Sequence, residues 1–250
     1  MALLKRFSAR ALLSLILCLH APSVWAIGKC YTACKPRSLF GFVTRAPANI
    51  SYPSHLLEAT DTSGTTLDEF RFVGVNTPNL ARIESNSSDS TQTTLPTESE
   101  IWDLLCGVQQ VGARVARIYV LSFCDDGTCH VSNGSAIPFN LSSDASPSLS
   151  FNEDWFLALD TAISTANDLG LRLIIPFINM IELQQWGGAA SLARWAGVPV
   201  SQFFENEITR MLYQKVVLNV LKRRNRLTGR LYVDEPSIFG WELGNELFSP

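Results

Sequence analysis

The fold of this chain is decided by one stretch, Ile238-Phe239-Gly240-Trp241-Glu242-Leu243-Gly244-Asn245-Glu246. Its apolar first half predicts a buried β-strand, and an Asn-Glu pair follows at the carboxyl end of that strand. In parallel α/β barrels the carboxyl ends of the strands carry the functional groups. The stretch therefore predicts both a sheet and the edge of that sheet at which Glu246 is presented.

Upstream, apolar runs that predict strands alternate with amphipathic segments that predict helices. The expected strands are 70–76, 115–123, 171–179 and 238–246, and the expected helices are 98–111, 152–170 and 203–224. Strands that are apolar throughout and alternate with helices predict a parallel sheet covered on its faces. Right-handed crossovers then allow a doubly wound sheet or a barrel.

Polar residues at the strand ends favour the barrel. Asn76, Asn179 and Glu246 end three expected strands, and Arg117 lies within the other. Polar groups gathered at this edge are typical of a (β/α)8 TIM barrel, and no glycine-rich phosphate loop follows the first strand. We therefore expect an α/β TIM barrel, with about its first four βα units present in residues 67–250.

The first 26 residues predict a signal peptide. Basic residues precede an apolar run over 11–19, and Val24-Trp25-Ala26 follows with small residues where signal peptidase needs them. The run is well short of the roughly 20 residues that span a membrane. We expect cleavage after residue 26, a secreted, extracellular protein without a membrane partner, and an irregular lead-in over residues 27–66.

The cysteines fit an oxidising compartment. Cys124 and Cys129 bracket a turn-rich loop and are expected to form a local disulfide. Cys30 and Cys34 can pair in the same way, which leaves Cys106 as a buried free thiol; a partner for the odd cysteine outside this sequence is the alternative. No histidine or second cysteine pair stands at zinc-site spacing, so no metal site is expected.

Composition and sequons agree with a secreted glycoprotein. The chain has 250 residues, 46% of them hydrophobic and 17% charged, with a net charge of −3, which gives no reason to expect a nucleic-acid partner. Sequons in polar segments predict N-glycosylation at Asn49, Asn86, Asn133 and Asn140.

Several stretches resemble those of one known family. They read Phe72-Val73-Gly74-Val75-Asn76, Gly112-Ala113-Arg114-Val115-Ala116-Arg117, Leu171-Arg172-Leu173-Ile174-Ile175-Pro176-Phe177-Ile178-Asn179 with Trp186-Gly187-Gly188 after it, and Asn225-Arg226-Leu227-Thr228-Gly229-Arg230-Leu231-Tyr232-Val233-Asp234-Glu235-Pro236-Ser237 running into the strand quoted first. This pattern, over residues 70–246, resembles glycoside hydrolase family 5, and most closely its secreted endo-β-1,4-mannanases from fungi and plants.

The resemblance implies a (β/α)8 barrel and retaining hydrolysis of a β-1,4-linked polysaccharide, as in a mannan endo-1,4-β-mannosidase. It implies that Glu246 is the general acid/base, that Asn245 bonds the sugar 2-hydroxyl and that Arg117 orients the nucleophilic glutamate. Asn179 and Trp186 would line substrate subsites, although Trp186 as a packing residue and Arg117 as a structural ion-pair residue stay open. The implied partner is the polysaccharide, with no cofactor, and the full-length protein is expected to be a monomer.

Glu242 is excluded as the catalytic partner of Glu246. Four residues along a strand span about 13 Å at about 3.3 Å per residue. The catalytic carboxylates of glycosidases lie about 5 to 9.5 Å apart. Glu242 is therefore interpreted as a structural charge bonded to a neighbour such as an arginine, and the nucleophile is expected on a seventh strand beyond Pro250. The 250-residue chain alone is thus expected to be inactive.

Two departures from the family keep alternatives open. Leu247 and Phe248 follow Glu246 where the family has Pro-Arg, and Met180 follows Asn179 where mannanases have a second asparagine. The alternatives are a family 5 β-glucanase or cellulase, and a secreted glycan-binding protein that kept the barrel and lost its chemistry.

Overall fold

The centre of the protein is a parallel sheet of four strands. The computed structural model describes residues 34–47, 55–77, 80, 83–84, 93–118, 123–125, 139–142, 148–180 and 188–247. The strands are β4 (Gly74–Thr77), β7 (Val115–Ile118), β11 (Arg172–Pro176) and β12 (Ile238–Glu242). They pair in the order β12-β11-β7-β4, and every pairing is parallel. Each new strand is therefore added to the same edge, as successive βα units require.

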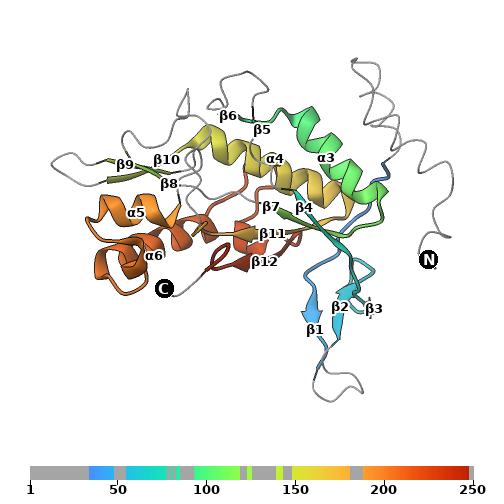
Figure 1. Cartoon of the computed structure of the whole chain (residues 1–250). Helices are drawn as coiled ribbons and strands as arrows, with labels where there is room; N and C mark the ends of the chain where they lie inside the picture. The colour runs from blue at the N-terminus through green and yellow to red at the C-terminus, as the bar shows by residue number, and fades with distance from the viewer. Residues whose placement is uncertain are drawn as a thin grey trace, which may run out of the picture.

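Two long helices cover one face of this sheet. Figure 1 shows α3 (Glu98–Gln110) and α4 (Glu153–Leu169) lying together across it. The strand residues that face these helices are fully buried and form one core with the apolar sides of the helices. This core includes Leu105, Ala116, Ile118, Phe156, Leu159, Ile163, Leu173 and Ile175. The opposite face of the sheet is more open, since Gly74 and Asn76 are exposed and Ile174 and Gly240 are half-buried.

The ends of α3 and α4 follow from local chemistry. Thr97 caps α3 with a capping box: its hydroxyl accepts a hydrogen bond from the Glu100 amide, and the Glu100 carboxylate accepts one from the Thr97 amide. Asn152 caps α4 by accepting hydrogen bonds from two backbone amides. Gly170 ends α4 at a φ of 66°, a left-handed conformation that glycine adopts without strain. Both predicted helices are therefore confirmed to within one or two residues.

The third predicted helix is shorter than expected. The structure has a short helix α5 (Ala189–Trp195), a 3-10 turn η2 (Val200–Gln202) and then α6 (Glu207–Leu221), which Asn206 caps. The predicted start at residue 203 was wrong. Helix α6 begins at Glu207 because the Asn206 side chain accepts hydrogen bonds from its first free amides, those of Ile208 and Thr209. A further 3-10 turn, η3 (Tyr232–Asp234), lies in the connection from α6 to β12.

The N-terminal lead-in is not wholly irregular. It contains β1 (Thr44–Arg45) and β2 (Leu56–Ala59), which join β3 (Leu67–Glu69) in an antiparallel sheet. Glu58 on β2 accepts hydrogen bonds of 2.5 and 2.7 Å from Arg114, the residue before β7. This small sheet therefore closes the amino-terminal edge of the parallel sheet, opposite the edge that carries Glu246.

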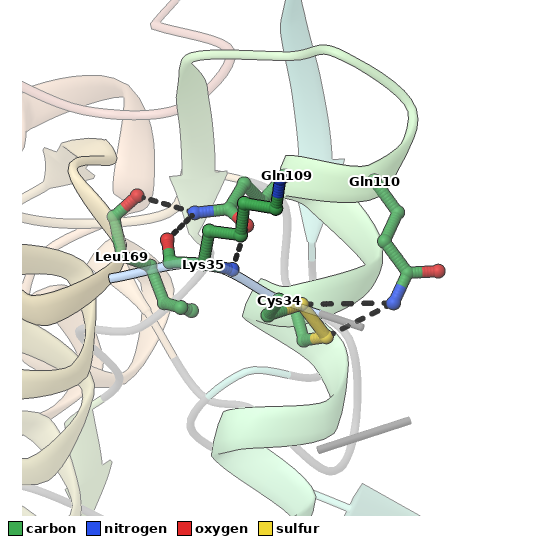
Figure 2. Close-up of a disulfide and its surroundings, with 6 residues drawn as sticks. Cys34, Lys35, Gln109, Gln110 and Leu169 are labelled. Atoms are coloured by element: carbon green, nitrogen blue, oxygen red, sulfur yellow. Dashed lines mark hydrogen bonds between the residues drawn. A yellow bond between two sulfur atoms is a disulfide. The ribbon is translucent and has the colours of Figure 1, made fainter. Parts of the chain in front are cut away.

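A disulfide fixes the chain before that small sheet. Cys34 is bonded to Cys106 on α3, with 5.7 Å between the Cα atoms. The possible pairing of Cys30 with Cys34, and with it a free thiol at Cys106, is therefore wrong. The Gln109 side chain accepts a hydrogen bond from the Lys35 amide and donates to the carbonyl oxygens of Lys35 and Leu169 (Figure 2). The segment thus ties the ends of α3 and α4 together, an arrangement that the spacing of the cysteines did not indicate.

Shorter strands complete the described part. They are β5 (Ile83–Glu84) with β6 (Thr93–Thr94), and β8 (Phe123–Asp125), β9 (Phe139–Ser142) and β10 (Ser148–Phe151), which form a separate three-stranded sheet. The predicted strand 115–123 therefore ends at Ile118 in the parallel sheet, and Phe123 begins a different sheet. In the part of the chain that the structure describes, no helix is both long and apolar enough to cross a membrane.

Candidate functional site

The predicted site residues meet at the carboxyl edge of the parallel sheet. Arg117 lies on β7 and Glu242 is the last residue of β12, whereas Asn179 and Asn245 lie just beyond β11 and β12. An isolated parallel bridge joins Asn179 to Asn245 past the ends of those strands. Four groups that lie far apart in the sequence therefore form one polar cluster because three neighbouring parallel strands end together.

Arg117 and Glu242 form the charged centre of this cluster. The Arg117 Nε atom lies 2.9 and 3.0 Å from the two Glu242 carboxylate oxygens, and Nη2 lies 2.5 Å from Oε2. The two side chains retain 20% and 33% of their exposure, so this ion pair is half-buried. The expected bond between Glu242 and an arginine is confirmed.

The same guanidinium fixes the side chain of Asn245. Arg117 Nη2 donates a hydrogen bond of 3.0 Å to Asn245 Oδ1, and Asn245 Nδ2 donates one of 3.0 Å to Asn179 Oδ1. Asn245 is only 7% exposed. Because its oxygen faces a cation, its amide group presents an N–H rather than an acceptor to any ligand at this edge.

The backbone beyond Glu242 leaves the extended conformation. The Asn245 amide donates a 2.7 Å hydrogen bond to the Ile178 carbonyl, and Glu246 has a φ of 52°. The expected strand 238–246 therefore ends at Glu242, and the expected strand 171–179 ends at Pro176. The spacing of about 13 Å drawn from an extended strand does not apply past Glu242. Glu242 is nevertheless held by Arg117, which leaves Glu246 as the exposed carboxylate of this turn.

Other predicted positions contribute less or lie outside the described residues. Met180 is 4% exposed and adds no polar group to the edge, whereas Leu247 is 41% exposed beside Glu246. Asn140 lies on β9, of which only the backbone is described, and the same holds for Cys124 on β8. Residues outside the described part are Asn49, Asn86, Cys129, Asn133, Trp186 and Phe248.

Two residues of the site were not predicted. Thr77, at the end of β4, donates a hydrogen bond of 3.2 Å to the Arg117 carbonyl, and Tyr213 on α6 donates one to the Leu243 carbonyl. Thr77 directly follows Asn76 at a strand end, so the pattern of polar residues at strand ends could have predicted it. Tyr213 is 30 residues from its acceptor, and no local pattern marks it. Within the described ranges, no group of three or more His, Cys, Asp and Glu side chains is placed to hold a metal ion.

Comparisons with known proteins find similarity to mannanases. A family model described as "GH family 5 beta-mannosidase-like" matches residues 190–249. The chain is 35% identical over 137 residues to mannan endo-1,4-beta-mannosidase 1 of Arabidopsis thaliana, covering 54% of this chain and 29% of that protein. Over these regions the chain is similar to glycoside hydrolase family 5 endo-mannanases. A rice putative mannan endo-1,4-beta-mannosidase 5 is 40% identical over 101 residues, which are 38% of this chain and 20% of that one.

Solved structures confirm the fold of this family 5-like chain. The endo-1,4-beta-mannanase from Rhizomucor miehei superposes with a TM-score of 0.61 at 23% identity, covering 83% of this chain and 49% of that one. The endo-beta-1,4-mannanase from Thermotoga petrophila gives a TM-score of 0.52 at 26% identity, covering 72% and 36%. The expected α/β fold of a partial TIM barrel is confirmed, and the chain spans about half the length of the first of these structures and under a third of the plant proteins.

Proposed function

We propose that this chain is the N-terminal half of a secreted, retaining glycoside hydrolase that cleaves β-1,4-linked mannan. One observation carries the proposal: an exposed carboxylate, Glu246, follows an asparagine whose amide is fixed by Arg117 at the carboxyl edge of a parallel sheet. In barrels of this kind the carboxyl edge holds the active site. The similarity to mannan endo-1,4-beta-mannosidases supports mannan as the substrate.

Each residue then has one role in the two-step reaction. Glu246 protonates the glycosidic oxygen as the bond to the leaving sugar breaks, and it later removes a proton from the attacking water. Asn245 donates its remaining amide N–H to the sugar 2-hydroxyl, since its oxygen is engaged by Arg117. Asn179 holds that amide in place, and both Asn179 and Trp186 border the substrate subsites.

The nucleophile comes from a later strand of the completed barrel. Retaining enzymes hold their two carboxyl groups about 5 to 5.5 Å apart, and Glu242 is engaged by Arg117. The pair with Glu242 holds the Arg117 guanidinium in one position. A cation fixed in this way can orient a second carboxylate that a later strand of the barrel supplies. Arg117 is therefore proposed to orient the nucleophile, while Glu242 keeps Arg117 in place.

Secretion is part of the same proposal. A signal peptide over residues 1–26 and glycosylation at Asn49, Asn86, Asn133 and Asn140 belong to an oxidising secretory route. The disulfide between Cys34 and Cys106 supports that route, because structural disulfides are rare in reducing compartments. A local disulfide between Cys124 and Cys129 is proposed for the same reason.

A second candidate is a secreted glycan-binding protein without hydrolase activity. Buried Met180 and exposed Leu247 favour it, because each replaces a polar or rigid family residue next to the proposed site. Glycan binding requires the polar edge of the sheet and the subsites, whereas hydrolysis also requires the two carboxylates in register.

The deciding experiment supplies the missing half of the barrel. Residues 27–250 are fused to the later βα units of a family 5 mannanase, and turnover of β-mannan and of soluble cellulose is measured with Glu246→Gln as the variant. We expect mannan turnover that falls about 10²- to 10⁴-fold in Glu246→Gln, the usual contribution of a general acid. Unchanged turnover in that variant contradicts the role of Glu246, preference for cellulose supports the glucanase alternative, and binding without turnover supports the glycan-binding protein. Robust turnover by the unfused chain contradicts the half-barrel proposal.

A further inference from the structure

The turn that carries Asn245 and Glu246 is held by groups outside the polar cluster. This turn, residues 243–247, begins where β12 ends and lies between the exit of β11 and helix α6. Glu246 has a φ of 52°, in the left-handed region that non-glycine residues rarely adopt. Such a conformation persists only where surrounding contacts determine it. The contacts that hold the left-handed backbone of Glu246 therefore also hold its carboxylate in the candidate site.

On one side, the turn is locked to the exit of β11. A Cβ atom on Gly244 would lie 2.5 Å from Leu247 Cδ2, 2.9 Å from Ile178 Cγ2 and 3.1 Å from the Ile178 carbonyl oxygen, so a larger residue would push these neighbours away. The Asn245 amide donates to that carbonyl at 2.7 Å, and the Asn245 carbonyl accepts from the Met180 amide at 3.1 Å. These contacts fix Asn245, in the second half of the turn. They do not involve Leu243, the first residue of the turn.

On the other side, helix α6 supplies the second anchor. The Tyr213 hydroxyl donates a hydrogen bond to the carbonyl oxygen of Leu243, the first residue of the turn. The Tyr213 ring is held edge-on against Phe203, with 5.8 Å between the ring centroids. Burial raises the pKa of Tyr213 to about 12, so the phenol keeps its proton and stays a donor at neutral pH. A helix residue thus sets where the turn leaves β12.

We propose that Tyr213 is a positioning residue for Glu246, acting through the Leu243 carbonyl on the turn that presents the carboxylate. The proposal rests on the proposed function, since it assigns Tyr213 to the placement of the same acid/base. Without the hydroxyl, Leu243 loses its anchor and the turn opens more often, although Gly244 and Asn245 still hold its second half.

Hydrogen exchange of the unfused chain tests the anchor without any activity. We expect Tyr213→Phe to speed exchange of the Asn245 amide roughly 3- to 10-fold, the effect of losing one hydrogen bond. Exchange of the Leu173 amide, which bonds to the Ser237 carbonyl at the other edge of the sheet, should stay unchanged. Tyr232→Phe is the matched control, because it removes a tyrosine hydroxyl at that other edge and should not speed Asn245 selectively. Equal Asn245 exchange in Tyr213→Phe and in the unsubstituted chain overturns the proposal.

Turnover in the mannanase fusion provides the second readout. Tyr213→Phe should lower kcat about 3- to 10-fold at unchanged KM, because the turn positions the acid and not the substrate. The same exchange measurement applies to the fusion if the unfused chain aggregates. If Tyr213→Phe speeds Asn245 exchange but neither the fusion nor the unfused chain turns over mannan, the result supports the Tyr213–Leu243 contact and contradicts the proposed function. Faster exchange with full turnover in Tyr213→Phe overturns the positioning role.

Discussion

Tyr232 donates a hydrogen bond of 2.6 Å to the buried carboxylate of Asp160, joining the connection before β12 to the middle of α4. The Arg226 amide donates to the other oxygen of that carboxylate at 3.1 Å, and Asn225 Nδ2 donates to the Asp160 carbonyl at 3.2 Å. Glu235 in the same connection is buried and accepts hydrogen bonds from Asn167 and Thr228. Residues 225–237, part of the stretch that resembles family 5, therefore form a buried polar network with α4 at the amino-terminal edge of the sheet.

Removing the Tyr232 hydroxyl is expected to destabilise this network. Tyr232→Phe keeps the ring but leaves a fully buried carboxylate with one partner fewer, which costs about 1–3 kcal/mol of the free energy of unfolding. Urea denaturation followed by circular dichroism measures the change. A loss below about 0.5 kcal/mol, the lower end for a hydrogen bond, would show that Asp160 finds another partner.

The cost of Tyr232→Phe should depend on pH. Burial raises the pKa of Asp160 from its usual 3.8, while the hydrogen bond from Tyr232 lowers it. A carboxyl with a raised pKa in the folded state loses stability as pH rises from its unfolded pKa through its folded pKa. Since Tyr232→Phe raises that pKa further, its destabilisation should be smallest at acidic pH, where the carboxyl is protonated in both proteins, and should grow towards neutral pH. Unfolding free energies from pH 3 to 7 test this, and a pH-independent difference contradicts it.

Glu242→Gln should cost more than the loss of a surface charge. The substitution leaves the half-buried Arg117 guanidinium without its bidentate partner, and we expect a loss of about 1–3 kcal/mol. Glu153→Gln is the matched control, because Glu153 bonds Arg223 and Arg226 but is 50% exposed. Exposed pairs of this kind contribute about 0–1 kcal/mol. Equal losses in the two variants, measured by urea denaturation, would mean that the Arg117 pair is screened like a surface pair.

The disulfide between Cys34 and Cys106 should contribute strongly to stability. It closes a loop across a sequence separation of 72 residues, and its replacement in Cys34→Ser/Cys106→Ser is expected to cost about 2–4 kcal/mol. Mass spectrometry of unreduced peptides should recover the two cysteines linked to each other, and calorimetry should show a lower melting temperature for the double variant. Alkylation of Cys106 in the unreduced protein would contradict the pairing.

Local signals predicted the parts of the fold that local chemistry determines. Asn152 and Gly170 marked the ends of α4 because an N-cap side chain and a left-handed glycine act within one turn of the helix. The apolar runs predicted the parallel sheet because their burial does not depend on exact register.

The remaining features depend on contacts between distant residues. The Cys34–Cys106 disulfide required knowing that residue 34 lies beside α3, and the Tyr213 contact required the position of α6 beside the end of β12. The strand predicted over residues 238–246 ends at Glu242. Past this residue the chain turns, and Gly244 packs closely against Ile178. In the site, the arginine pair of Glu242 was predictable from charge burial alone, whereas the fixed orientation of the Asn245 amide was not.

The position of the Asp160 network has a consequence for evolution within such barrels. Residues 225–237 join α6 to β12 at the amino-terminal edge, whereas Glu246 stands at the carboxyl edge. With Glu246 as the proposed acid/base, folding and catalysis depend on separate ends of β12. Under the proposed function, a protein that lost the acid at residue 246 would keep the Tyr232–Asp160 bond. Residues 225–237 would then report the fold, and residue 246 would report the chemistry.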